Sequence, residues 1–208
     1  MKRTTLISLI IMLSLSTTAQ MSWMAKAGYN MGNVKAEYLG ISRTTKVKSG
    51  FNFGVGLKTF FDYNLYFTPQ IGYSLKSFEV SYGADSSVRS SDTKIHYIEI
   101  PLLLQMYINP NASNRLFFQY GPSFNYAFTG KETVTLQDGS TQKRNIRFGE
   151  VYYGHWEASL IAAIGVEFSN GFYGSANFNL GLTNISNNDE GPKLKTRVIS
   201  LNLGYYFK

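Results

Sequence analysis

Three side chains that could support hydrolysis stand at alternate positions in one segment: His155, Glu157 and Ser159. A serine hydroxyl becomes a nucleophile when a histidine takes its proton and a carboxylate orients that histidine. In an extended strand, residues two apart share one face, so the three side chains could point to the same side. The same spacing is typical of polar residues that fill a protein interior, and we favour that interpretation over a catalytic one.

Composition restricts the other chemistries. The 208 residues include no cysteine and only two histidines, His96 and His155, so thiolate chemistry and a histidine-based metal site are excluded. The polar run Asn-Asn-Asp-Glu at 187–190 lacks the ligand spacing of a known calcium loop. We therefore expect no catalytic residue, no metal and no cofactor.

A period of two in hydrophobicity predicts the elements that carry these residues. In the segment 51–57, large apolar residues occupy the odd positions, and asparagine or glycine occupies the even ones. Such alternation is typical of β-strands whose two faces meet different surroundings, and no helical period is present after residue 22. Most of these segments are long for a soluble sheet. Eight strands are predicted, at Trp23–Lys35, 51–58, 65–80, 98–108, 116–126, 156–167, 172–180 and 199–207.

The two strand faces indicate which solvent each one meets. A water-exposed surface usually contains about 25–35% charged residues, whereas only 16% of this chain is charged. Opposite the large apolar residues the strands carry mainly Gly, Ser, Asn, Gln and Ala, which suit the interior of a narrow barrel. The apolar face would then contact lipid, and closure of the sheet would pair every backbone group. The sequence predicts an all-β, eight-stranded, antiparallel up-and-down transmembrane β-barrel; a soluble barrel is the alternative.

Aromatic and proline positions add two expectations. Aromatic residues near strand ends match the interfacial girdles of a membrane barrel. Pro69, Pro101 and Pro122 fall within strands and lack the N–H that a ladder needs, so we expect each one at a bulge or beside a shortened rung. The expected girdle residues are Trp23, Tyr63, Tyr66, Tyr107, Tyr126, Trp156, Tyr205 and Phe207.

Short and long connections alternate along the chain. Tight turns at 62–64, 109–114 and 169–171 alternate with longer connections at 36–48, 82–93, 130–151 and 185–195. In membrane barrels the short turns are periplasmic and the long loops are extracellular. Asp138-Gly139 is a strong hairpin signal, so the hairpin 131–150 is predicted to continue the fifth and sixth strands as a protruding ribbon. Its edge could pair with an incoming strand, or be kept solvated by charges such as Lys143 and Arg144.

The first nineteen residues read as a signal peptide. Lys2 and Arg3 precede an apolar run at 6–15 and the small residues Thr17-Thr18-Ala19, an order typical of secretory signals and too short to span a bilayer. We expect 1–19 to be removed and 20–208 to form the barrel domain. Removal leaves 18 basic and 13 acidic residues, a net charge of about +5, which does not by itself indicate nucleic-acid binding.

Several segments together resemble a known family. The Gly-Phe segment at 50–56, Tyr-x-Glu-Ile-Pro at 97–101, Tyr-Gly-Pro at 120–122 and the aromatic end at 203–208 are similar to the PorT-like outer-membrane β-barrel family of Bacteroidota. The resemblance implies a porin-like barrel of eight strands, without a catalytic motif, and some members take part in protein secretion. A terminal aromatic strand resembles the signal read by the barrel-insertion machinery, although Lys208 follows Phe207 here.

Charged residues fall into two groups. Lys26, Lys58, Glu99, Glu157 and Glu167 are predicted to form the polar and charged cluster of the lumen, with Lys26, Lys58 and Glu167 low in the barrel. Buried charges must be paired, so Glu99 and Glu157 require a cation, which a folded-in loop could supply. Cations near the outer side could instead contact the phosphates of outer-leaflet glycolipid. The preferred candidates for such contacts are Lys46, Lys48, Lys143, Arg144 and Arg197. They belong to a wider outer-side group that also includes Arg43, Lys131, Lys193 and Lys195.

These observations predict a non-enzymatic integral outer-membrane protein, exported by its signal peptide, with a structural or interaction role at the cell envelope. Its contact surface would be the extracellular loops and the hairpin 131–150. The expected partners are outer-membrane lipids and glycolipid, the insertion machinery during biogenesis, and an envelope or secretion protein, but not nucleic acid. Two alternatives stay open: a lipid-modifying hydrolase that uses His155 and Ser159, and a narrow conduit for small solutes.

Overall fold

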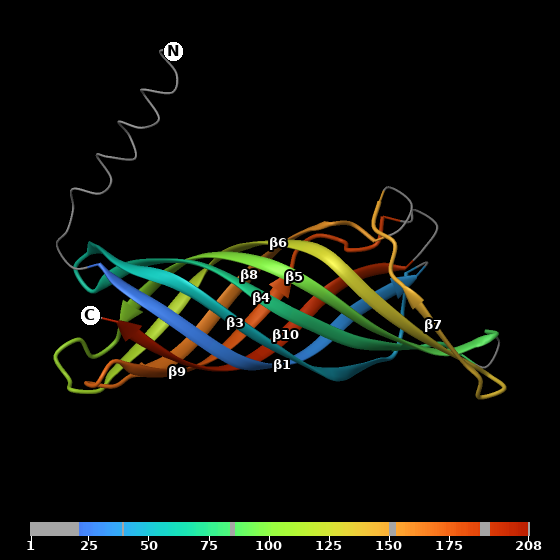
Figure 1. The fold of residues 1–208 in the computed structure, drawn as a ribbon, viewed down its shortest axis with the longest axis horizontal. Helices are drawn as coiled ribbons and strands as arrows, with labels where there is room; N and C mark the ends of the chain where they lie inside the picture. Colours follow the sequence, from blue (N-terminus) through green and yellow to red (C-terminus); the bar gives the residue numbers. More distant parts are fainter. Residues whose placement is uncertain (1–20, 39, 84–85, 150–152, 188–191, 208) are drawn as a thin grey trace, which may run out of the picture.

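The computed structural model of the chain describes residues 21–38, 40–83, 86–149, 153–187 and 192–207. They form one antiparallel sheet that closes on itself, because β1 pairs with β10 from Trp23↔Phe207 to Glu37↔Lys193 (Figure 1). None of the described residues belongs to a helix long and apolar enough to cross a membrane. The eight strands of the ring are β1 (Ser22–Tyr38), β3 (Thr45–Asp62), β4 (Leu65–Ser81), β5 (Val88–Tyr107), β6 (Arg115–Leu136), β8 (Trp156–Glu167), β9 (Phe172–Gly181) and β10 (Lys193–Phe207).

Two short strands lie outside this ring. β2 (Ile41–Ser42) pairs antiparallel with the end of β1, and β7 (Thr141–Asn145) pairs with the far end of β6. The predicted eight-stranded antiparallel barrel is confirmed. The predicted strand 98–108 was too short at one end, however, since β5 begins at Val88, inside what the sequence suggested was a loop. The pairing of β6 out to Leu136 agrees with the predicted ribbon.

The barrel therefore has two unlike ends. At the end with the short turns, here called the turn end, β3, β5 and β8 each connect to the next strand within a few residues. At the other end, the loop end, β5, β6 and β7 project together beyond the ring (Figure 1). The hairpin at Asp138-Gly139 forms as predicted, with Gly139 at a φ of 85° that favours glycine. The returning strand of the hairpin does not run directly into β8, the sixth strand of the ring, because β7 ends at Asn145 and β8 begins only at Trp156.

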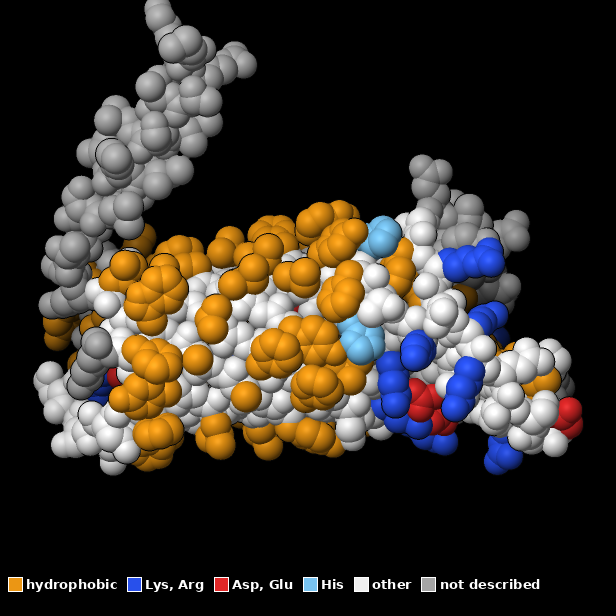
Figure 2. Space-filling view, in the orientation of Figure 1, with side chains coloured by type: hydrophobic (Ala, Val, Ile, Leu, Met, Phe, Trp, Pro, Cys, Tyr) orange, Lys and Arg blue, Asp and Glu red, His pale blue; other side chains and the backbone are white. Residues whose placement is uncertain are grey.

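The large apolar side chains face outward. Phe51, Phe53, Ile71 and Leu203 are each at least half exposed, whereas inward-facing residues such as Asn125 are fully buried. Figure 2 shows the hydrophobic side chains as a wide belt around the barrel, with Lys, Arg, Asp and Glu gathered at the loop end. An exposed apolar belt of this kind is the lipid-facing surface expected of a transmembrane barrel.

Two expected girdle residues turn out to be internal. Trp23, Trp156 and Phe207 are exposed at the belt's edges, as predicted. Tyr107 is only 3% exposed, and Tyr66 packs against it inside the barrel. The prediction for these two used closeness to a strand end and ignored that Tyr107 shares the inner face with Gln105.

Apolar clusters occupy both ends of the interior, which differs from the uniformly polar lumen that was expected. Near the turn end the cluster consists of Met24, Tyr107, Phe117, Tyr173 and Tyr206. A second cluster near the loop end includes Phe78, Ile95, Tyr97 and Leu194. The polar and charged side chains lie mainly between and beside these clusters.

The three strand prolines are accommodated without bulges. The register is constant on both sides of each one, with Pro69 opposite Leu102, Pro101 opposite Ser123 and Pro122 opposite Leu160. Beside them the ladders lack pairs, between Pro69 and Gly72 for example. Missing rungs therefore absorb the lost N–H donors, which is one of the two predicted solutions, and the predicted bulges are absent at these positions.

Candidate functional site

Glu167 is the centre of a charged cluster in the lumen near the turn end. The Lys58 ammonium lies 3.0 Å from Glu167 Oε2, and the Arg115 guanidinium and the Tyr107 hydroxyl also donate to this carboxylate. The Lys58 Nζ atom lies 3.7 Å from the centre of the Tyr206 ring. Cations and a hydroxyl donor from three strands, β3, β5 and β6, thus converge on one carboxylate of β8 and link the barrel wall across its interior.

A second charged cluster lies further along the lumen. Lys76 of β4 is fully buried, and its Nζ atom lies 2.9 Å from Glu157 Oε2 and 3.0 Å from Glu99 Oε1. Thr196 donates to the other oxygen of Glu157. The cation that Glu99 and Glu157 required therefore comes from a barrel strand and not from a folded-in loop, and the sequence reasoning missed it.

Lys26 lies away from the cluster in which it was predicted. It interacts electrostatically with Glu99, and both residues line a small internal cavity. The register explains this position, because Lys26, Gly54, Gly72 and Glu99 follow one another directly across four strands. The two glycines between them carry no side chain, so the lysine and the carboxylate face each other across bare backbone. A Cβ at Gly72 would lie 2.5 Å from the Phe53 carbonyl oxygen, so any larger residue at position 72 would clash with the backbone.

Neutral polar side chains fill the lumen around these clusters. Asn52 donates to Asn30 at 2.7 Å, and Ser200 donates to the same Asn30 oxygen at 2.8 Å. Gln119 donates to Gln105 at 2.6 Å. Contacts of this kind join neighbouring strands on the inner wall and occupy the space that a solute would need.

The candidate hydrolytic residues do not assemble. His155 is bonded to the Ala127 carbonyl oxygen at 2.8 Å and stacks on Tyr126 and Phe148. The Ser159 hydroxyl accepts a hydrogen bond from Asn125, and Glu157 is held by Lys76. Each of the three side chains therefore has other partners among the described residues. The polar-interior interpretation describes Glu157 and Ser159, while His155 belongs to an aromatic group at the loop end.

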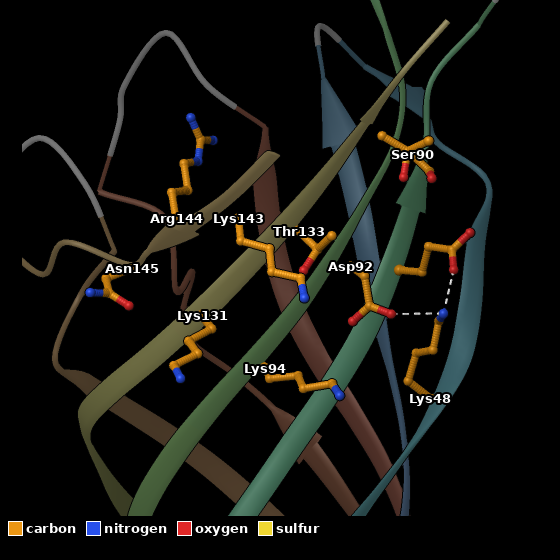
Figure 3. A pocket seen from close by; sticks show the side chains of 11 residues that line it. Lys48, Ser90, Asp92, Lys94, Lys131, Thr133, Lys143, Arg144 and Asn145 are labelled. Carbon is orange, nitrogen blue, oxygen red and sulfur yellow. Dashed lines mark ion pairs between the residues drawn. The ribbon is translucent and has the colours of Figure 1, made fainter. Parts of the chain in front are cut away.

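A charged cleft of about 610 Å³ lies on the outer wall at the loop end, at the base of the hairpin (Figure 3). Two adjacent rows of outward-facing residues build it. One row runs from Lys46 through Glu79, Asp92 and Thr133 to Lys143. In the next row, Lys94 stands directly opposite Lys131, which in turn stands opposite Asn145.

The acidic side of this outer cleft is neutralised within the chain. Lys48 Nζ lies 2.6 Å from Glu79 Oε2 and 2.8 Å from Asp92 Oδ2, and Lys46 Nζ lies 2.9 Å from Glu79 Oε1. Hydrogen bonds from Lys48 and Lys46 lower the pKa of the Glu79 carboxyl. Hydrogen bonds to Asp92 and Glu79 raise the pKa of Lys48.

The basic side of the outer cleft has no such neutralisation. Lys94, Lys131 and Lys143 are exposed and form no ion pair within the part of the chain that the structure describes. Arg144 pairs with Glu132 at 2.7 Å. Among the lining side chains there are five cations and two carboxylates, a net charge of +3. An anion is therefore the ligand that this cleft would favour.

Aromatic side chains lie immediately below the cleft on the same wall. Tyr73 contacts Phe51, Phe53 and Phe128, and its hydroxyl bonds to His96 Nδ1 at 2.6 Å. His96 thus belongs to an interfacial aromatic group on the lipid-facing side. The cleft begins where the lipid-facing belt ends.

Four of the five predicted phosphate contacts come together at or beside the outer cleft: Lys46, Lys48, Lys143 and Arg144. Arg197 does not, since it lies exposed on β10 between β1 and β9. The sequence reasoning counted Lys131 among the cations near the outer side but missed Lys94. The signal for Lys94 was present in the sequence, because Lys94 continues the outward alternation of His96 and Ile98 into the charged end of the strand.

Comparisons with known proteins agree with this architecture. The family model for the outer membrane protein beta-barrel domain matches residues 16–187. OprG of Pseudomonas aeruginosa is similar in structure, with a TM-score of 0.52, 13% identity, and coverage of 89% of this chain and 95% of that one.

Two further structures align over most of the chain with less overall agreement. Ail of Yersinia pestis, solved with the heparin analogue sucrose octasulfate, has a TM-score of 0.44, 18% identity, and coverage of 91% of this chain and 100% of that one. Neisserial surface protein A has a TM-score of 0.45 and 11% identity, with coverage of 91% and 100%. No curated protein sequence matches the chain significantly. With a family model that spans most of its length and a barrel of the OprG type, the chain belongs to the outer membrane protein beta-barrel domain family.

Proposed function

We propose that this protein is a non-enzymatic component of the cell envelope with a structural or interaction role, and that the hairpin 131–150 is its principal contact surface. The observation that carries the proposal is the projection of β5, β6 and β7 beyond the lipid-facing belt, with the charged outer cleft at its base. We place the loop end outside the cell, as in other barrels with short periplasmic turns.

The edge of β7 offers a second means of contact. All five residues of β7 are exposed, and the strand pairs with β6 on one side only among the described residues. An open strand edge can accept a strand from a partner. Lys143 and Arg144 at this edge favour an acidic partner segment over self-association.

The interior supports a structural role more than the two alternatives. Two ion pairs and the hydrogen bond from Tyr206 to Gln105 cross the lumen, which favours a closed barrel over a conduit. His155 and Ser159 have separate partners, which weakens the proposal of a hydrolase. Steady conductance in planar bilayers, or glycolipid turnover that depends on Ser159, would each revive the corresponding alternative.

Site-specific photo-crosslinking in intact cells tests the proposed surface. A photoreactive residue at Gln142 of β7 is compared with one at Ser113 in the turn after β5. We expect defined adducts from position 142 and none of comparable yield from position 113. Adducts from position 113 alone would contradict the proposal and favour an accessory role in protein secretion through the periplasmic turns.

A further inference from the structure

The outer cleft contains an arrangement of charge that the described residues leave uncompensated. Lys94 and Lys131 stand directly opposite each other on β5 and β6, and Lys143 lies one row further out on β7. Side chains in directly opposed positions have Cβ atoms about 4.5–5.5 Å apart, and like charges there are destabilising. The nearby carboxylates of Glu79 and Asp92 are already bonded to Lys48, so they do not relieve this repulsion.

From this geometry we infer that the outer cleft binds the phosphate groups of a membrane glycolipid in the outer leaflet. A phosphate monoester carries about −1.5 to −2 charges at neutral pH, so one or two such groups match the net charge of +3 of the lining. The inference rests on the proposed contact surface and names one ligand of that surface.

The position of the outer cleft identifies a lipid as the source of the phosphate. The cleft lies on the outer wall and not in the mouth of the barrel, since Lys94 shares the outward face with His96 and Ile98. Lys94 is two residues beyond His96, which is about 7 Å along a strand and about 5 Å along the membrane normal at a usual tilt. A lipid whose acyl chains cover the aromatic group around Tyr73 would therefore place its headgroup at the lysines.

Figure 3 shows the side chains that line the outer cleft. Lys94, Lys131 and Lys143 extend from three neighbouring strands, with the ammonium groups of Lys94 and Lys131 turned to opposite sides, while Lys48 is turned toward its two carboxylates. Three ammonium groups on a rigid sheet can donate charge-assisted hydrogen bonds to one or two phosphates. The neighbouring Asn145 adds an amide that can serve a sugar hydroxyl.

The test measures glycolipid binding by the full barrel in nanodiscs of zwitterionic phospholipid. Bisphosphorylated glycolipid is titrated against its dephosphorylated form, and bound copies are counted by native mass spectrometry. The variant Lys94→Ala/Lys131→Ala/Lys143→Ala is compared with Lys193→Ala/Lys195→Ala/Arg197→Ala, which removes the same charge from exposed positions of β10. A third variant, with arginine at 94, 131 and 143, keeps the charge of the outer cleft.

We expect the wild type to prefer the phosphorylated form and the alanine variant of the cleft to lose affinity at least about tenfold, the effect of one lost charged hydrogen bond. The β10 variant should stay within about twofold, and the arginine variant should retain most of the affinity. Equal binding of both glycolipids, or equal losses in the two alanine variants, would overturn the inference. Inorganic pyrophosphate that binds as tightly as the glycolipid would overturn the lipid source.

This test and the crosslinking test can fail independently. If the wild type shows no phosphate-dependent binding, the glycolipid is ruled out as a ligand, but a protein partner for the hairpin is not. Absence of adducts at position 142 contradicts the proposed contact surface, even if glycolipid is found to bind at the outer cleft. Circular dichroism of each variant establishes that the barrel has folded before binding is compared.

Discussion

Lys76 and Lys94 lie on adjacent rungs of β4 and β5, since Lys94 pairs with Ser77, yet their side chains lie on opposite faces of the sheet and differ in ion pairing. Lys76 points into the lumen, where two carboxylates contact it and almost no surface is exposed. Lys94 points outward and faces another lysine. The two lysines lie on opposite faces of one sheet. Carboxylates of the described residues compensate the charge of Lys76 but not that of Lys94, which is available to a ligand.

The comparison follows from the solvent on each side. Inside the wall an unpaired ion would lose its hydration without replacement, so Lys76 must bring its own partners. At the outer edge of the belt water and headgroups are available, so an unpaired lysine costs little. Charges without partners at such a position therefore indicate binding more than folding.

The largest expected effect comes from removing the lumen cation. Lys76→Met leaves Glu99 and Glu157 facing each other in the interior and should lower the free energy of unfolding by about 3–5 kcal/mol. Urea unfolding in detergent micelles measures this loss. The double variant Lys76→Met/Glu157→Gln should recover a large part of it, since Glu99 keeps Lys26. A loss below about 1 kcal/mol for Lys76→Met would contradict the claim that the buried charges in the lumen depend on one another.

Glu167→Gln should be somewhat less damaging. The change leaves Lys58 without its carboxylate, but Arg115 is about one-third exposed and can turn toward solvent. We expect a loss of about 2–3 kcal/mol in the same unfolding experiment. Arg115→Gln is the matched control, and it should cost less than half as much. The opposite order would show that the rim, and not the buried pair, holds the turn end together.

The acidic side of the outer cleft gives a smaller, pH-dependent effect. Because the pKa of Glu79 is lowered in the folded state, its contribution is complete above the ordinary carboxyl pKa and is lost as pH falls through the lowered value. Acidification below about pH 4.5 should therefore destabilise the β4–β5 extension by about 1 kcal/mol or less. Hydrogen exchange at pH 6 and pH 3 measures this, and Glu79→Gln should remove the difference. An undiminished difference in that variant would assign it to other groups.

The smallest effect is expected at Lys94. Without glycolipid, Lys94→Ala removes a like-charge contact with Lys131 and should change the free energy of unfolding by less than about 0.5 kcal/mol, or raise it slightly. Lys193→Ala on β10 serves as the control for an exposed lysine. A clear destabilisation by Lys94→Ala in pure detergent would mean that the chain does compensate this charge.

The strands of the barrel were predictable because their signal is local. Alternation such as that of residues 51–57 indicates which side chains face lipid, and the number of alternating segments predicts the eight strands of the ring. The outward extension of β5 was missed, whereas the hairpin signal at Asp138-Gly139 predicted that of β6. Around Asp92 neither face of the strand is strongly apolar, so the period of two carries little contrast.

The contacts in the lumen depend on register between strands that are distant in sequence. Lys76 and Glu157 are 81 residues apart, and no local pattern states that they meet. Lys26 was predicted near Glu167 because its height was counted from the nearest turn. Strands in a barrel are tilted and staggered, so the row that starts at Lys26 crosses Gly54 and Gly72 and reaches Glu99 instead.

The most direct test combines the two lysines in one experiment. Urea unfolding of the wild type, Lys76→Met and Lys94→Ala is measured in micelles with and without saturating bisphosphorylated glycolipid, since a ligand stabilises only the form that binds it. We predict that Lys76→Met lowers stability by the same amount in both conditions, and that Lys94→Ala loses stability only when glycolipid is present. If glycolipid stabilises the wild type and Lys94→Ala equally, the distinction between compensated and ligand-binding charges is wrong.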